Sequence, residues 1–138
     1  MRNVNPTTTK SWQKLGRHYN EIKNVHLKSL FKNNDHRKTN FTIQFNDFEF
    51  DYSKNRITEE TLNYLLKLAN EVDLKSAIEA QFSGQKINQT EKRAVLHTAL
   101  RSQLNNEVFV DGENIVPEIK EALNKIELFT NKVVSGDW

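Results

Sequence analysis

The sequence predicts a mainly α fold with one small β-hairpin. Apolar residues recur three or four positions apart through most of the chain, the spacing that places them on one face of a helix. One stretch near residue 45 alternates apolar and polar residues instead, which is typical of strands. The chain has 138 residues, of which 28% are charged and 36% hydrophobic, so its size and composition are those of one ordinary domain.

Two helices are predicted before the hairpin. The first spans about residues 9–23, because Thr8 or Thr9 can cap its start and apolar side chains follow at helical spacing. The residues of this apolar stripe are Trp12, Leu15, Tyr19 and Ile22. The second helix spans about residues 25–32, with Asn24 as a possible cap. The stretch "KNNDHRKTN" that follows is rich in turn-forming residues and predicts a polar loop.

The hairpin is predicted over about residues 41–52. Phe41, Ile43 and Phe45 alternate with polar residues, and the alternation resumes after Asn46-Asp47, a pair that tolerates the positive φ of tight turns. A two-stranded ribbon is not stable alone and must pack its apolar face on something. We therefore expect Phe41, Ile43 and Phe45 to be mostly buried against helices. A base-stacking platform is the alternative.

Four further helices are predicted after the hairpin, at about residues 58–72, 74–83, 89–101 and 117–135. Thr58 can cap the first of them, and Gly84 can end the second. Pro117 suits the first turn of the last helix, which Gly136 ends. Between the last two helices, "VFVDGENIV" predicts a short strand with an Asp-Gly turn.

The predicted helix at 89–101 carries the most distinctive set of side chains. Asn88 and Glu91 fit a capping box, and Arg93, His97 and Arg101 would then form one row along the helix. Such a row can bind a phosphate or carboxylate, since arginine presents a planar fork of donors. Structural ion pairs produce the same pattern. We expect the row to be structural, with at least one arginine paired to an acidic side chain or to helix-terminal carbonyls.

The residues alone reveal no active site. The four glycines are scattered, no His-x-x-x-His spacing occurs, and the absence of cysteine excludes disulfides and thiolate chemistry. No apolar run approaches the length of a membrane span, and the start lacks the apolar core of a signal peptide, so a cytoplasmic protein without membrane contact is expected. The first 56 residues are net basic, which leaves a small basic helical module that binds nucleic acid as an alternative.

Several stretches in the same order resemble the phosphoglucose isomerase family. The string "TEKRAVLHTALR" is similar to a Thr-Glu-Gly-Arg-Ala-Val-Leu-His-x-Ala-Leu-Arg string typical of that family. The other matching stretches are "FDYSKNRITEET", "FSGQKIN", "VDGENIVPEI" and "VVSGDW". The resemblance runs from "NPTTTKSWQKL" to Trp138, nearly the whole chain.

The resemblance implies an aldose–ketose isomerase of glycolysis and gluconeogenesis that interconverts glucose and fructose phosphates through an enediol. It implies a homodimer and no cofactor or metal. Residues 1–138 would be a single N-terminal helical segment of an α/β enzyme of sugar-isomerase type, without its sugar-phosphate-binding domains. None of the family's catalytic or substrate-binding residues maps onto this chain; His97 does not match the catalytic histidine. The chain alone is therefore expected to be inactive, and sugar phosphate would bind only to the intact enzyme.

Two departures from the family pattern bear on local structure. Lys92 stands where the family usually has glycine, which would strain the backbone if that position needs a positive φ. The stretch "SQLNNEVF", residues 102–109, replaces the family's Asn-Arg-Ser-Asn-Thr-Pro segment, so the loop path there is expected to differ.

Overall fold

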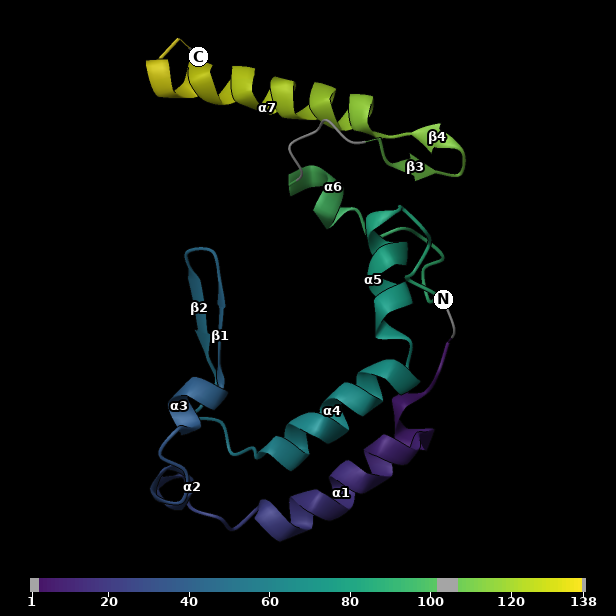
Figure 1. The fold of residues 1–138 in the computed structure, drawn as a ribbon. Coiled ribbons are helices and arrows are strands. Elements are labelled where there is room, and N and C mark those ends of the chain that lie inside the picture. Colours follow the sequence, from purple (N-terminus) through teal and green to yellow (C-terminus); the bar gives the residue numbers. More distant parts are fainter. Residues whose placement is uncertain (1–2, 102–106, 138) are drawn as a thin grey trace. The chain divides into compact units, whose positions relative to one another are not determined.

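The structure is a computed structural model that describes residues 3–101 and 107–137 (Figure 1). Its contacts group the chain into two compact units, one over Arg2–Asp73 and one over Leu74–Trp138, with Met1 assigned to the second. We describe each unit by itself. The prediction of a mainly α chain with a small hairpin is confirmed. The prediction of a single segment over residues 1–138 stays a prediction.

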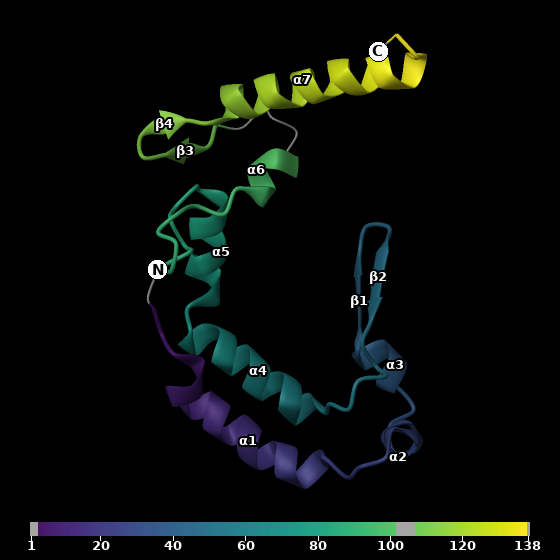
Figure 2. The same cartoon turned by 180° about the vertical axis from the view of Figure 1, so that it is seen from behind.

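The first unit is built on two antiparallel helices. Its elements are a 3-10 turn Pro6–Thr8, α1 (Lys10–Ile22), α2 (Leu27–Lys32), α3 (Arg37–Asn40), β1 (Thr42–Phe45), β2 (Phe48–Asp51) and α4 (Glu59–Glu71). Figures 1 and 2 both show α1 and α4 side by side, in agreement with the contacts between them. The hairpin β1–β2 extends from α3, and its pairing is antiparallel with Phe45 opposite Phe48.

The described residues of the second unit form three helices and a second, smaller hairpin. Its elements are α5 (Leu74–Phe82), α6 (His97–Arg101), β3 (Phe109–Val110), β4 (Glu113–Asn114) and α7 (Val116–Ser135). The stretch predicted as one strand with an Asp-Gly turn is thus a two-stranded hairpin, with Phe109 opposite Asn114. Asp111 and Gly112 both have positive φ there, as a two-residue hairpin turn requires.

The predicted helix ends are confirmed where a side chain or a glycine fixes them. The Thr9 hydroxyl accepts from the Trp12 backbone N–H at the start of α1. Thr58 and Thr61 cap α4 reciprocally, each hydroxyl accepting from the other residue's N–H. Gly136 ends α7 at φ +82. These signals are local, so they act wherever the chain packs.

The helix predicted over residues 89–101 is wrong in its first part, because the described helix begins only at His97. The Asn88 side chain accepts from the Glu91 N–H as a cap would, but the Asn88 and Arg93 backbones then bond to each other in both directions. Lys92 lies between them at φ +53, a left-handed conformation that cannot continue a right-handed helix. The lysine that replaces the family's glycine therefore occupies a position that favours glycine.

Two shorter elements also differ from prediction. The second helix was predicted to start near 25 with Asn24 as its cap, whereas α2 starts at Leu27 and the His26 ring accepts from the Lys28 N–H. The polar stretch after α2, predicted as a loop, contains the one-turn helix α3. Most of the divergent stretch at 102–109 lies outside the described residues, which resume at Glu107.

Burial departs most from the sequence prediction. On α1, Trp12 and Tyr19 of the predicted apolar stripe are 46% and 62% exposed, whereas His18 is buried. On the hairpin, Phe41 is buried as predicted, but the prediction is wrong for Ile43 and Phe45, which are exposed. The described buried apolar side chains are Phe41, Ala80, Ala99 and Val116. Polar groups therefore hold much of the described structure together.

Candidate functional site

Arg37 is the most heavily engaged side chain at the base of the hairpin. It lies on α3 and is only 2% exposed. Its Nε donates to the Ser53 carbonyl at 2.9 Å, and one terminal nitrogen donates to the carbonyls of Asn55 and Ile57 at 2.8 and 3.0 Å. One guanidinium thus holds the whole segment that connects β2 to α4.

Two aromatic rings lie against the Arg37 guanidinium. Its guanidinium carbon lies 4.6 Å from the centre of the Phe41 ring and 5.5 Å from that of Phe31. Such stacking is favourable for a planar, weakly hydrated cation. Burial lowers the pKa of Arg37. The side chain has carbonyls and rings as partners, so its role is to fix the chain path.

His18 forms the centre of the junction between α1 and α4. Its Nε2 lies 2.7 Å from the Thr61 hydroxyl, and its Nδ1 lies 3.3 Å from a Glu21 carboxylate oxygen. The ring is 5% exposed and meets the Tyr64 ring edge to face. Both ring nitrogens therefore have hydrogen-bond partners within the protein, and the imidazole joins the two helices.

A pocket of the first unit borders this junction. The residues that line it include His18, Glu21, Arg37, Phe41, Glu59 and Glu60. One Glu60 carboxylate oxygen lies 3.8 Å from His18 Nδ1, and the other accepts from the Tyr64 hydroxyl at 2.6 Å, which raises the pKa of Tyr64. Glu59 and Glu60 lie in the first turn of α4, where negative charge stabilises the helix, so their position has an ordinary structural explanation.

The far end of the α1–α4 pair is closed by Glu71. Its carboxylate accepts from the Ser11 N–H and from the Ser11 hydroxyl, each at 3.0 Å. The last turn of α4 thereby caps the first turn of α1. The backbone hydrogen bond from Ser11 lowers the pKa of Glu71, with further contributions from the hydroxyls of Ser11 and Thr9. The group is ionised at neutral pH and serves as an intramolecular anion at a helix N-terminus.

The predicted row of Arg93, His97 and Arg101 does not lie on one helix. Arg93 lies in the loop before α6 and pairs with Glu91, with 2.6 Å between Nε and Oε2. This confirms that at least one arginine of the row is paired with an acidic side chain. Arg93 and His97 line a shallow pocket together with Lys86, but Lys86 pairs with Asp111 at 2.7 Å. Lys86 and Arg93 are therefore already paired with carboxylates, and Lys92 also lines this pocket.

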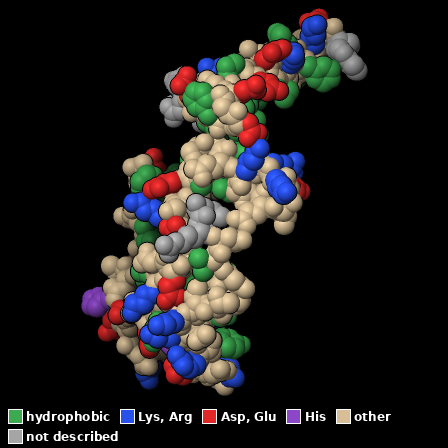
Figure 3. Space-filling view, turned by 90° about the vertical axis from the view of Figure 1, so that its right-hand side faces the viewer, with side chains coloured by type: hydrophobic (Ala, Val, Ile, Leu, Met, Phe, Trp, Pro, Cys, Tyr) green, Lys and Arg blue, Asp and Glu red, His purple; other side chains and the backbone are tan. Residues whose placement is uncertain are grey.

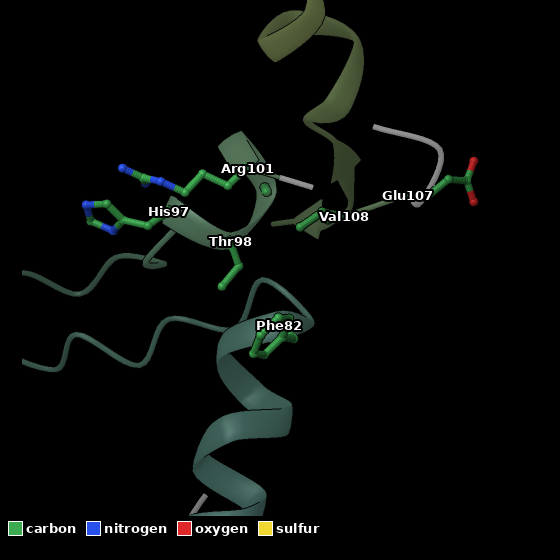
Figure 4. Close-up of a pocket in the computed structure, with 7 residues that line it drawn as sticks. Phe82, His97, Thr98, Arg101, Glu107 and Val108 are labelled. Carbon is green, nitrogen blue, oxygen red and sulfur yellow. The ribbon is translucent and has the colours of Figure 1, made fainter. Parts of the chain in front are cut away.

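His97 and Arg101 remain neighbours on α6, beside a mostly apolar pocket (Figure 4). Figure 4 shows both side chains leaving α6 on the same side, whereas Thr98 points towards Phe82. Glu107 points away on the other side of the pocket. The described groups around this pocket do not bring a base, a donor and a nucleophile together, so the arrangement has no evident reaction chemistry.

The remaining charges are distributed rather than gathered. On the face drawn in Figure 3, basic, acidic and hydrophobic side chains alternate along α7. Among the described residues, no helix combines the length and apolarity needed to cross a bilayer. No cluster of three or more potential metal-binding side chains occurs within that same part of the chain.

The sequence did not reveal the two residues that organise the first unit. The sequence predicts a polar loop around Arg37, whereas the hydrogen-bond partners of Arg37 lie 16 to 20 positions away. His18 lies next to Tyr19 of the apolar stripe, and its partner Thr61 is 43 positions distant. A signal for Arg37 was present only in its short separation from Phe31 and Phe41. Neither residue could be paired with its carbonyl or hydroxyl partner without the fold.

Comparison with known proteins identifies the family of this chain. The family model described as phosphoglucose isomerase matches residues 51–138. A curated relative named glucose-6-phosphate isomerase, from Christiangramia forsetii, is 53% identical over 136 residues, which are 99% of this chain and 25% of the relative. The chain thus spans about a quarter of the length of that relative. The resemblance seen in its motifs is confirmed, and the chain belongs to the phosphoglucose isomerase family.

Proposed function

We propose that this chain forms part of an aldose–ketose isomerase that interconverts glucose 6-phosphate and fructose 6-phosphate in glycolysis and gluconeogenesis. The observation that carries the proposal is the family match over residues 51–138, together with 53% identity to a protein named glucose-6-phosphate isomerase. In this proposal, the groups that bind the phosphate and move the proton come from polypeptide outside residues 1–138.

The chemistry of the described residues supports a scaffolding role. Isomerisation through an enediol needs a base beside the substrate and fixed donors around the phosphate. In the first unit, His18 bonds to Thr61 and Glu21, and Arg37 bonds to three backbone carbonyls. The side chains best suited to such chemistry are thus already committed to holding helices and loops.

The assembled enzyme of this proposal is a cytoplasmic homodimer that uses neither metal nor organic cofactor. The sugar phosphate binds only where the missing groups are present. The alternative of nucleic-acid binding gains no support from the structure, because acidic side chains accompany the basic ones in both units. In the first unit, three acidic side chains each contact a polar or basic group. They are Glu21 and Glu49, which lie within the net basic first 56 residues, and Glu71, which follows them.

Two assays test the proposal. The purified chain is tested alone, and then mixed with the part of the Christiangramia forsetii relative that this chain does not match, in an assay that couples glucose 6-phosphate formation to a dehydrogenase. We expect no turnover of fructose 6-phosphate by either piece alone and saturable turnover by the mixture. Turnover by the chain alone would refute the assignment of the reacting groups to other polypeptide. A mixture that associates but stays inactive would refute the proposed function.

A further inference from the structure

The hairpin of the first unit carries a largely exposed apolar face, on which only the Phe50 ring has a described ring neighbour, Tyr52, at 5.6 Å. In its register Ile43 lies opposite Phe50 and Phe45 lies opposite Phe48, so these four side chains share one face of the ribbon. We call these four residues the hairpin face. They are 56%, 65%, 71% and 77% exposed in the order Ile43, Phe50, Phe45 and Phe48. The opposite face carries only polar side chains: Thr42, Gln44, Glu49 and Asp51.

The exposed area of the hairpin face is large for so short an element. A buried aromatic side chain covers about 150–250 Å², so three largely exposed phenylalanines and one isoleucine present on the order of 500 Å². That is the size of the largest apolar patch on an ordinary soluble monomer, and patches of this size are often functional. The strict separation of apolar and polar faces indicates that one side of the ribbon is made to be covered.

The hairpin face is held in position from its base. Phe41, immediately before β1, is 1% exposed and meets the Tyr52 ring edge to face. The Thr42 hydroxyl donates to the Lys38 carbonyl, and the Asp51 carboxylate accepts from the Ser53 N–H. The hairpin therefore projects from an anchored base and presents its apolar face in a fixed direction, which reduces the entropy lost when a partner binds.

Charge argues for a protein occupant over a nucleic acid. Asp47, Glu49 and Asp51 lie on the hairpin, and residues 39–53 contain no lysine or arginine, although Lys38 from α3 lies 4.0 Å from Glu49. Nucleic-acid binding depends on cations that neutralise phosphates. An acidic ribbon repels a phosphate backbone even though its rings would suit base stacking. The base-stacking alternative raised by the sequence is therefore disfavoured by the acidic side chains of the turn and of the opposite face.

We propose that the hairpin face is a docking surface for the part of the isomerase polypeptide that has no counterpart in this chain. The proposal rests on the proposed function, because that function supplies the partner. The relative of Christiangramia forsetii is about four times as long as its matched region, since this chain covers 25% of it. The polypeptide available as the occupant is thus much larger than this chain.

The test compares two double variants that change opposite sides of the same ribbon. Phe45→Ser with Phe48→Ser removes two rings from the hairpin face, and Gln44→Ser with Glu49→Ser alters the polar face as the matched control. Each chain is titrated with the unmatched part of the Christiangramia forsetii relative, and binding is measured by calorimetry. We expect the ring variant to bind at least tenfold more weakly than the parent, and the control to bind within about threefold of it.

Three further results are decisive. Equal binding by the ring variant and the control overturns the proposal. An apolar-surface dye should bind the parent chain alone more strongly than the ring variant; an unchanged dye signal would mean that the face is already covered, and overturns it too. A parent chain that forms a dimer by light scattering, and becomes monomeric in the ring variant, would assign the face to a second copy instead.

The folding of the variants is monitored separately. Circular dichroism should show the same helix content in both double variants, because the changed side chains are exposed. If the ring variant loses helix, the single change Phe48→Lys, next to the turn, replaces it in the titration with the same expectation. If the parent mixture is active but the ring variant binds as tightly as the parent, only the proposed docking surface is refuted. If the parent mixture is inactive and the ring variant no longer binds, the docking surface is upheld and the proposed function is refuted.

Discussion

The α1–α4 junction and the hairpin face belong to the same unit but are stabilised in opposite ways. At the junction, His18, Thr61 and Glu71 connect two antiparallel helices through hydrogen bonds that the chain completes by itself. The hairpin face instead has three phenylalanines that are each at least 65% exposed. Buried polar groups need hydrogen-bond partners within the chain. Exposed apolar side chains need no such partners and can be covered by a surface outside the chain. The chain thus supplies the partners of the junction residues, whereas it leaves the hairpin face largely uncovered.

The largest expected effect comes from removing the anchor of the hairpin. Arg37→Ala deletes three hydrogen bonds from a buried cation and leaves three carbonyls without that donor. We expect the free energy of unfolding to fall by about 3 kcal/mol, since bonds to charged groups contribute about 1.5–3 kcal/mol each and are not additive. Urea unfolding followed by circular dichroism measures this loss. Lys38→Ala, an adjacent change at an exposed side chain, should alter the free energy by less than about 0.5 kcal/mol.

A smaller loss is expected at the centre of the junction. Thr61→Val keeps the shape of the side chain but removes the hydroxyl that contacts the His18 ring and accepts from the Thr58 N–H. We expect a loss of about 1–3 kcal/mol, because a buried imidazole nitrogen and a helix cap both lose a partner. The same urea experiment checks it, with Asn63→Ala on the exposed side of α4 as the control. Equal losses in both variants would contradict the importance of the junction.

The junction should also respond to pH through Glu71. Its pKa is lowered in the folded chain by the Ser11 backbone bond, so the unfolded state binds its proton more tightly. The stabilisation is therefore fully present above the ordinary pKa of about 4.3 and is lost as the pH falls through the lower folded value. Glu71→Gln should flatten the pH dependence of the unfolding midpoint between about pH 5 and 3. A dependence as steep as that of the parent would show that Glu71 is not its source.

The smallest expected effect lies on the hairpin face. Phe48→Ser changes a side chain that is 77% exposed, so little burial is lost. We expect the free energy of unfolding of the chain alone to change by less than about 0.5 kcal/mol. A loss of about 2 kcal/mol, the value typical of a buried ring, would show that the face already packs within the chain. A large loss in the free energy of unfolding at Arg37 and almost none at Phe48 would distinguish the anchored base of the hairpin from its uncovered face.

The elements that the sequence predicted well are those with local signals. The Thr58 cap and the glycine at 136 lie next to the helix ends that they determine, so α4 and α7 start and end as expected. The alternation around Asn46 determined the hairpin for the same reason. The family motifs added a prediction that local chemistry could not make, namely that the groups needed for isomerisation do not map onto this chain; this stays a prediction.

The predictions that were wrong depended on distant partners or on an ambiguous local signal. The Asn88 side chain accepts a hydrogen bond from the Glu91 N–H, three residues later. A helix cap and a turn both contain such a bond, and the positive φ of Lys92 shows that this one belongs to a turn. Burial of Ile43 and Phe45 was inferred from the assumption that apolar faces are covered within the chain. That assumption fails here, because both side chains are exposed in the described structure.

Hydrogen exchange tests the contrast between the two regions most directly. Amide exchange is measured by NMR on the chain alone and on the chain mixed with the unmatched part of the Christiangramia forsetii relative. We predict that amides of α1 and α4 are protected in both samples, because the bonds of His18, Thr61 and Glu71 are internal to the chain. Amides of β1 and β2 should exchange at least tenfold faster in the chain alone than in the mixture. Equal protection of β1 and β2 in the two samples would contradict the account.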